Sequence, residues 1–248
     1  MSTTTNVLIT GPNRGIGNGL LTAYLSRPNH TIIAGVRNPS ASEHLKAIPK
    51  AANTTLIIVK IDNEDDSTAA AAVSELKTTH NITSIDLVIA NAGILDYFGR
   101  VAGTPPVQMT RHFQVNTISS LVLFEAVFPL LEAATAPAKF VQISSAVGSM
   151  TIMPFITFDC TPYGASKAAS TYVVRKIHFE NPGLIAFPVH PGWVQTEMGN
   201  AGAEAAGTEK ADITLEQSVT GLMSVIDKAT REETSGNLMN YDGKVLPW

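Results

Sequence analysis

The stretch NVLITGPNRGIG, residues 6–17, joins a short apolar run to a glycine-rich turn and then to a helical pattern. Glycines at positions 11, 15 and 17 allow a sharp turn and a close approach of the backbone to a ligand. A helix that begins at such a turn offers free N–H groups and a positive dipole end to a pyrophosphate. An ordinary strand-to-helix turn fits the same pattern, so the rest of the chain has to decide between them.

Along the remaining chain, apolar runs alternate with helical patterns. Strands are predicted at 6–10, 31–37, 54–62, 85–93, 139–145, 184–192 and 235–243, and helices at 15–25, 65–80, 106–134, 163–181 and 214–231. Near-continuous apolar strands separated by helices indicate a parallel sheet covered on both faces. The sequence therefore predicts an α/β fold, in which residues 1–248 form a single Rossmann-fold domain with a doubly wound, seven-stranded parallel sheet.

Composition bounds the class of protein. The 248 residues suit one α/β domain, and 44% hydrophobic against 15% charged residues indicate a globular core. The net charge of −4 and the scattered Lys and Arg argue against a nucleic-acid or membrane surface. The single cysteine, Cys160, allows no internal disulfide. Because the N-terminal apolar run is short and lacks a preceding basic segment, we expect a soluble cytoplasmic protein.

Six short motifs stand in order at the predicted strand and helix ends: TGPNRGIG (10–17), ANAG (90–93), FQVNT (113–117), ISS (143–145), YGASK (163–167) and PGWVQT (191–196). Together they resemble the short-chain dehydrogenase/reductase family over nearly the whole chain. The tail GNLMNYDGKVLPW (236–248) is similar to the C-factor and sniffer-type carbonyl reductase branch. RKIHFEN (175–181) and PGWVQTEMG (191–199) resemble fungal polyketide ketoreductases, notably norsolorinic acid ketoreductase.

The end of the second predicted strand indicates which nicotinamide cofactor binds. Arg37 stands where an NAD enzyme of this fold places an acidic residue on the ribose 2′-OH. A guanidinium binds a 2′-phosphate that a carboxylate would repel, and Arg14 in the glycine loop adds a second cation. The two arginines predict NADPH/NADP+, although solvated surface side chains are the alternative.

The family resemblance implies further cofactor contacts. Asp62 would meet the adenine ring, although a solvated loop aspartate fits nearly as well, and Thr196 would meet the nicotinamide carboxamide. The expected cofactor-binding residues are Gly11, Asn13, Arg14, Gly15, Ile16, Gly17, Arg37, Asn38, Asp62, Asn63, Asn91, Ala92, Gly93, Tyr163, Lys167, Pro191, Gly192, Val194 and Thr196.

Tyr163 and Lys167 are the central catalytic prediction. Residues four apart share a helix face, and an ammonium there lowers the phenol pKa from its ordinary value of about 10. Such a phenol is a general acid for carbonyl reduction. On spacing alone an ordinary surface pair is the better explanation, but the position after the fifth strand, where ligands of open α/β sheets bind, favours a site.

A serine should hydrogen-bond the substrate oxygen as negative charge develops there. Strand alternation turns Ser144 and Ser145 in opposite directions. The family commonly has glycine three residues after this serine, which Gly148 satisfies for Ser145, with Ser144 as the alternative.

Asn116 lies inside an apolar helical run, where an asparagine is unfavourable unless its side chain has a role. The resemblance implies a water-mediated link to Lys167, and a satisfied core amide is the alternative.

Two irregular segments are expected to select the substrate: a spacer over 148–161 and a lid over about 193–212. Their apolar character predicts an apolar or aromatic ketone or aldehyde. The expected pocket residues are Tyr97, Met150, Met153, Phe155, Phe158, Trp193 and Met198.

Three further expectations concern metals, partners and the possible absence of turnover. The histidines show no metal-ligand spacing, so no metal is expected. The resemblance implies a homodimer or homotetramer built on helices 106–134 and 163–181. It also leaves a rival function open, in which a C-factor-like signalling protein binds NADPH with little turnover.

Overall fold

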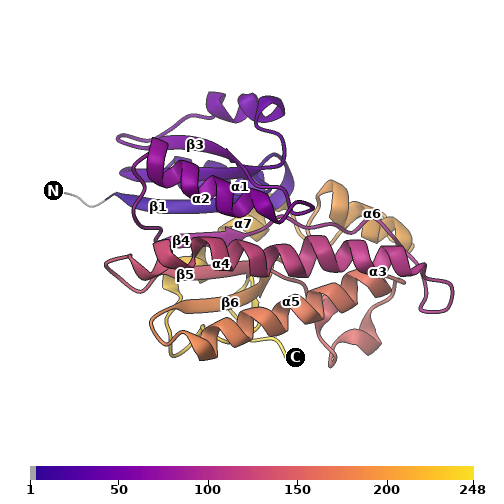
Figure 1. The fold of residues 1–248 in the computed structure, drawn as a ribbon. Coiled ribbons are helices and arrows are strands. Elements are labelled where there is room, and N and C mark those ends of the chain that lie inside the picture. Colours follow the sequence, from indigo (N-terminus) through magenta and orange to yellow (C-terminus); the bar gives the residue numbers. More distant parts are fainter. Residues whose placement is uncertain (1–3) are drawn as a thin grey trace.

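The computed structural model describes residues 4–248, which form one sheet of seven parallel strands in the order β3-β2-β1-β4-β5-β6-β7 (Figure 1). The predicted fold class is confirmed. The strands are β1 (Thr5–Thr10), β2 (His30–Val36), β3 (Thr55–Lys60), β4 (Leu87–Ala90), β5 (Lys139–Ile143), β6 (Ile185–His190) and β7 (Met239–Asn240). Because the strand order reverses between β1 and β4, the loops that follow these two strands diverge and leave room for a ligand.

Helices cover both faces of the sheet (Figure 1). They are α1 (Gly15–Leu25), α2 (Ser67–Thr79), α3 (Pro106–Phe113), α4 (Ser119–Glu132), α5 (Thr161–Glu180), α6 (Glu197–Ala205) and α7 (Leu215–Lys228). Strand alternation divides the core in two. Val7 and Ile9 pack with buried residues of α1 and α7, whereas Leu8 packs with those of α2, α4 and α5.

Four segments differ from the sequence expectation. The expected lid contains helix α6, which begins where Thr196 Oγ1 accepts a hydrogen bond from Gly199 N at 3.1 Å. The seventh strand has only two residues, since glycines with positive φ at positions 236 and 243 turn the chain on either side of it. A 3₁₀ run, Ser40–Ala47, was not predicted. The spacer contains another short 3₁₀ turn, Met153–Phe155.

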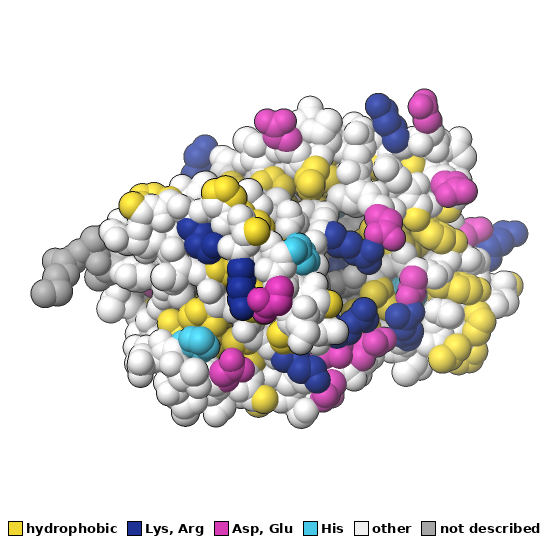
Figure 2. All heavy atoms as spheres, turned by 90° about the horizontal axis from the view of Figure 1, so that it is seen from above, with side chains coloured by type: hydrophobic (Ala, Val, Ile, Leu, Met, Phe, Trp, Pro, Cys, Tyr) yellow, Lys and Arg dark blue, Asp and Glu magenta, His cyan; other side chains and the backbone are white. Residues whose placement is uncertain are grey.

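One helical stretch of residues 4–248, Pro106–Glu132, is long and apolar enough to cross a membrane. It comprises α3, a π-helical turn at Gln114–Ile118 and α4. Leu123, Val127 and Leu130 of this stretch are buried in the core beside the sheet, so we assign its apolar character to packing. The face shown in Figure 2 intersperses basic with acidic side chains, without a large patch of one sign.

Candidate active site

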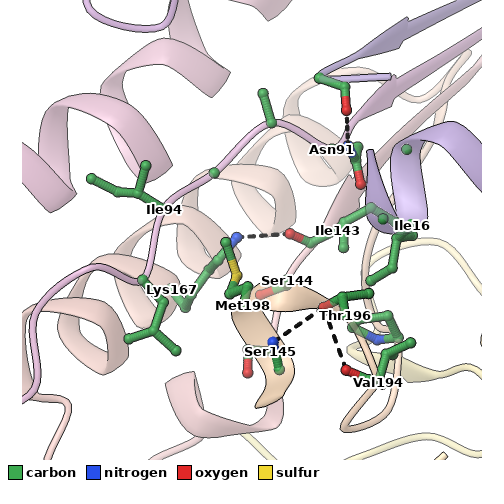
Figure 3. A pocket seen from close by; sticks show the side chains of 18 of the residues that line it. Ile16, Asn91, Ile94, Ile143, Ser144, Ser145, Lys167, Val194, Thr196 and Met198 are labelled. Atoms are coloured by element: carbon green, nitrogen blue, oxygen red, sulfur yellow. Dashed lines mark hydrogen bonds between the residues drawn. The ribbon is translucent and has the colours of Figure 1, made fainter. Parts of the chain in front are cut away.

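A cavity of about 1050 Å³ lies at the carboxyl edge of the sheet. The glycine turn after β1 and the loop after β4 form one end of it, and the segments after β5 and β6 form the other. Figure 3 shows Asn91, Ser145, Lys167 and Thr196 around the cavity, although they come from four different parts of the chain. The parallel sheet thus brings most of the predicted residues together.

The glycine turn has the backbone that a pyrophosphate site requires. Gly11 and Gly15 have φ of +64° and +55°, a region that favours glycine. A Cβ on Gly17 would collide with the Gly11 carbonyl and lie 2.5 Å from Asn91 Nδ2. Asn91 Nδ2 donates to the carbonyls of Thr10 and Gly11 at 2.9 and 3.2 Å, so its amide holds the backbone of the turn in place. The N-terminus of α1 therefore faces the cavity, and the turn fits a dinucleotide.

The two predicted arginines lie at the glycine-turn end of the cavity and differ in their partners. Arg14 pairs with Glu197 at the start of α6, and both side chains are exposed. Arg37 makes no ion pair with any residue of the described chain and lines the cavity. Arg37 is therefore the cation available to a phosphate without breaking an existing pair.

Most of the other predicted cofactor residues line the cavity, but the side chains of Asp62, Asn63 and Asn38 also make hydrogen bonds within the protein. Asp62 lines the cavity and accepts a hydrogen bond from Glu64 N at 3.1 Å. Asn63 turns its amide toward the protein, where it donates to the Val115 carbonyl at 3.0 Å. Asn38 lies outside the lining and accepts from Ala41 N at 3.3 Å. The remaining predicted residues line the cavity: Asn13, Ile16, Ala92, Gly93, Pro191, Gly192, Val194 and Thr196.

Tyr163 and Lys167 lie on α5 and are both buried at the cavity. Lys167 Nζ donates to the Ile143 carbonyl at 2.8 Å (Figure 3) and lies 5.7 Å from the centre of the Tyr163 ring. Burial lowers the pKa of Lys167 to about 8. Burial raises the pKa of Tyr163 to about 12, and the Ser145 hydroxyl partly opposes that rise. The expected lowering of the phenol pKa by Lys167 is wrong for this cofactor-free chain, because desolvation outweighs the other effects.

The two serines face different ways. Ser145 caps a short 3₁₀ turn, accepts from Val147 N at 3.2 Å and lies near the Tyr163 phenol. The Ser144 hydroxyl is 2.7 Å from the Thr171 hydroxyl on α5 and is buried there. This arrangement favours Ser145 as the serine that meets a substrate oxygen.

Asn116 lies in the π-helical turn between α3 and α4. Its Oδ1 accepts from Ile94 N at 2.8 Å, and its Nδ2 donates to the Ile94 carbonyl and to Ser166 Oγ, each at 3.0 Å. The side chain therefore binds the loop after β4 to α5. This is what we expect if Asn116 is an amide whose hydrogen bonds are satisfied within the core. The water-mediated link to Lys167 stays a prediction.

An aromatic stack connects the spacer to the lid. The rings of Phe158 and Trp193 are stacked 5.7 Å apart at 24°, and Trp193 Nε1 donates to the Gly199 carbonyl at 2.9 Å. The ring centre of Phe98 lies 6.2 Å from that of Phe158, with the two rings tilted by 60°. Phe158 and Trp193 line the cavity, as do Phe155 and Met198. The predicted spacer and lid thus form one continuous wall.

Three predicted pocket residues lie outside the lining. Met150 and Met153 are exposed and lie outside the lining, although Phe155, which belongs to the same 3₁₀ turn as Met153, takes part in it. The Tyr97 ring instead lies against Gly99. Residues that the sequence analysis missed take part in the lining: His190, Asn240, Tyr241 and Leu246. His190 could have been found, since it stands at a strand end before Pro191, but no local pattern marks the other three.

Between residues 4 and 248, no three His, Cys, Asp or Glu side chains are placed to hold a metal ion. Cys160 is buried, and burial raises the pKa of its thiol to about 11, so a reactive thiolate is disfavoured at neutral pH.

A glycine turn, a Tyr–Lys pair and a serine around one cavity define a dehydrogenase site of the short-chain type. The short chain dehydrogenase family model matches residues 5–207, and the chain belongs to this family. The prediction from the six motifs is confirmed.

Individual relatives are more specific. The chain is 45% identical to norsolorinic acid ketoreductase nor1 of Dothistroma septosporum, over 98% of this chain and 92% of that protein. It is 40% identical to norsolorinic acid ketoreductase of Aspergillus parasiticus, over 97% and 90%. Its structure resembles NADPH-bound carbonyl reductase from chicken fatty liver, with a TM-score of 0.85, 27% identity and full coverage of both chains. Carbonyl reductase Sniffer of D. melanogaster gives a TM-score of 0.84 at 25% identity, covering 99% of this chain and 100% of that chain.

Substituting the two serines separately tests their orientation. We expect Ser145→Ala to lower kcat by about 100-fold or more, since a donor to the developing oxyanion is lost. Ser144→Ala should leave kcat nearly unchanged and lower the free energy of unfolding by about 1 kcal/mol, since it loses the hydrogen bond to Thr171. Steady-state kinetics and urea unfolding of both variants measure these effects. A reversed pattern would show that Ser144 faces the substrate.

Burial of Lys167 predicts a pH dependence of stability. Its folded pKa of about 8 lies below the ordinary 10.5, so between these values the unfolded chain binds one proton more. From pH 8 to 10.5, the wild-type free energy of unfolding should therefore rise by up to about 3 kcal/mol relative to Lys167→Met. Below pH 8 the difference should be constant. Denaturant unfolding of the cofactor-free proteins between pH 7 and 10 measures it, and parallel curves would contradict the assignment.

Proposed function

We propose that this protein is an NADPH-dependent carbonyl reductase that reduces the ketone or aldehyde of an apolar or aromatic substrate. The observation that carries the proposal is the buried Tyr163 phenol, which is protonated at neutral pH and lies near Ser145 at the cavity of the glycine turn. A protonated phenol is the form needed to donate to a carbonyl oxygen. The relatives named ketoreductases and carbonyl reductases support the same direction of reaction.

The residues at the glycine-turn end fit a dinucleotide with a 2′-phosphate. The close approach at Gly17 and the N-terminus of α1 suit the pyrophosphate, and the unpaired Arg37 suits the 2′-phosphate. NADPH, when bound, would supply the hydride. Arg14 could join Arg37 only by leaving Glu197.

The chain's own residues would handle the proton. Ser145 and Tyr163 would both donate hydrogen bonds to the substrate oxygen, and the Tyr163 proton would move onto that oxygen as negative charge develops. Lys167 has a pKa of about 8, so its ammonium is a ready proton donor near neutral pH. Its burial beside the phenol keeps that exchange apart from bulk water.

The wall of the cavity suggests the substrate class. Phe155, Phe158 and Trp193 present aromatic surface to the cavity. A flat, apolar ring system matches this wall better than a phosphorylated or CoA-linked chain does. The fungal relatives are named as ketoreductases of norsolorinic acid, which supports a ketone as the substrate.

We further propose a cytoplasmic location and a homodimer or homotetramer. Exposed apolar side chains on the two long helices support an assembly through these faces. They are Val107, Ile118 and Leu121 on the α3–α4 stretch, and Tyr172 and Phe179 on α5. An NADPH-binding regulator with little turnover would have the same fold, so turnover itself is the discriminating measurement.

Removing the phenol hydroxyl tests catalysis. Tyr163→Phe should lower NADPH oxidation with an aromatic ketone by about 100- to 10,000-fold, the range for a lost general acid. The dissociation constant for NADPH should change little. Tyr172→Phe, an exposed tyrosine on the same helix, is the matched control and should keep the wild-type rate. Equal rates for wild type and Tyr163→Phe would exclude the enzymatic proposal.

Arg37 tests the choice of cofactor. Arg37→Ala should raise the NADPH dissociation constant by about 10- to 100-fold, because a charge-assisted hydrogen bond to the 2′-phosphate is lost. Binding of NADH, which has no 2′-phosphate, should change less than threefold or so. Lys77→Ala, which removes an exposed charge from α2, controls for net charge. Fluorescence titration of wild type and both variants with NADPH and NADH measures these dissociation constants. An equal loss of affinity for both cofactors in Arg37→Ala would contradict the assignment.

A further inference from the structure

His190, at the carboxyl end of β6, has an incomplete set of hydrogen bonds. Its Nδ1 is enclosed by protein and has no partner among the residues that the structure describes. Its Nε2 is not enclosed in this way, and the residue lines the cavity. Buried polar atoms without partners are rare in folded proteins, so the enclosure of Nδ1 bears on which ring nitrogen carries the proton.

The fold places His190 beside the catalytic group. Val189 pairs with Ile143, and Ser144 N donates to the Val189 carbonyl at 2.8 Å, so His190 lies one strand away from the two serines. Ala186, on the same side of β6, packs in the core of α5, which indicates that the His190 ring is on the α5 side. This is the side on which Tyr163 and Lys167 lie.

Among residues 4–248, no side chain supplies a partner for Nδ1 of the ring. Asn240 is its register partner on β7, but the Asn240 amide donates to Asp242 Oδ1 at 2.8 Å. The Tyr241 N–H donates to the His190 backbone carbonyl at 2.9 Å and leaves the ring untouched. Leu246 adds an apolar surface to this part of the cavity.

The enclosure of Nδ1 determines where the ring carries its proton. Burial lowers the pKa of His190 to about 4, against a weaker opposing effect of Asp242, so the ring is neutral near pH 7. A neutral ring has one N–H. Backbone N–H groups are left without an acceptor more rarely than carbonyls are left without a donor, and by the same reasoning we place the ring proton on Nε2. Since Nδ1 is enclosed and the residue lines the cavity, Nε2–H is the ring donor that remains for a molecule in the cavity.

We propose that His190 is a specificity-determining residue, whose Nε2–H donates a hydrogen bond to a second oxygen of the substrate, remote from the carbonyl that is reduced. The inference rests on the proposed function, since it assumes an aromatic carbonyl compound in this cavity. The oxygen must be an acceptor, such as an ether, phenol or quinone oxygen. A site built to bond such an oxygen discriminates against an analogue that lacks it.

Methoxyacetophenones and the corresponding ethylacetophenones, substituted at each ring position, test the donor. The two groups have nearly the same size, and only methoxy accepts a hydrogen bond. At one ring position or more, wild-type kcat/KM should favour methoxy over ethyl by about tenfold, as one hydrogen bond provides. His190→Leu should abolish this preference, and His190→Gln, which keeps an N–H donor, should retain most of it. A preference that is unchanged in His190→Leu would overturn the proposal.

A measurement independent of turnover separates this inference from the proposed function. If wild type reduces none of these ketones with NADPH, the failure counts against the proposed substrate class. Imidazole ¹⁵N NMR then tests His190 directly, with its signals identified by their loss in His190→Gln. We expect a neutral Nε2–H ring between pH 6 and 8, and a shift of the Nε2 resonance on adding NADP+ with a methoxyacetophenone but not with its ethyl analogue. An Nδ1–H ring, or the same response to both compounds, would overturn the proposal.

Discussion

The hydrogen bonds from Asn91 Nδ2 to the carbonyls of Thr10 and Gly11 join the loops after β1 and β4, at the place where the strand order reverses. The remaining site is arranged around this connection. Gly17 can approach Gly11 closely only because it has no Cβ, and the N-terminus of α1 faces the cavity as a result. A bulkier residue in the turn would move the helix away from the edge of the sheet.

Burial sets the protonation of the catalytic group. Desolvation moves the pKa of Lys167 down and that of Tyr163 up, so the two values separate even though the side chains are neighbours on α5. Lys167 lies close to the loop after β4, since a Cβ on Gly93 would be 3.5 Å from Lys167 Nζ. Asn116 binds this loop to α5 through Ile94 and Ser166. The π-helical turn that contains Asn116 is thus part of the support of the site.

The site could be predicted from the sequence where it depends on residues that are close together along the chain. The motif at 10–17 implied a turn between a strand and a helix, and Tyr163 and Lys167 implied one helix face; both arrangements are present. Prediction from the sequence was least reliable in the substrate wall. Met150, Met153 and Phe155 are all apolar and exposed, but of these three only Phe155 lines the cavity, and no local pattern distinguishes it from the methionines. Tyr241 and Leu246 reach the cavity from the end of the chain, where no pattern marks them.

The sequence by itself determined the seven-stranded parallel fold and the family, and it placed most of the predicted residues at the carboxyl edge, because strand and helix periods and glycine positions are local properties. Only the tertiary structure showed that the Ser144 hydroxyl bonds to Thr171 on α5, how burial shifts the phenol pKa, and that His190 lines the cavity with its Nδ1 enclosed. Those properties come from neighbours that lie tens of residues away along the chain. Such contacts exist only once β5, β6 and α5 have packed together.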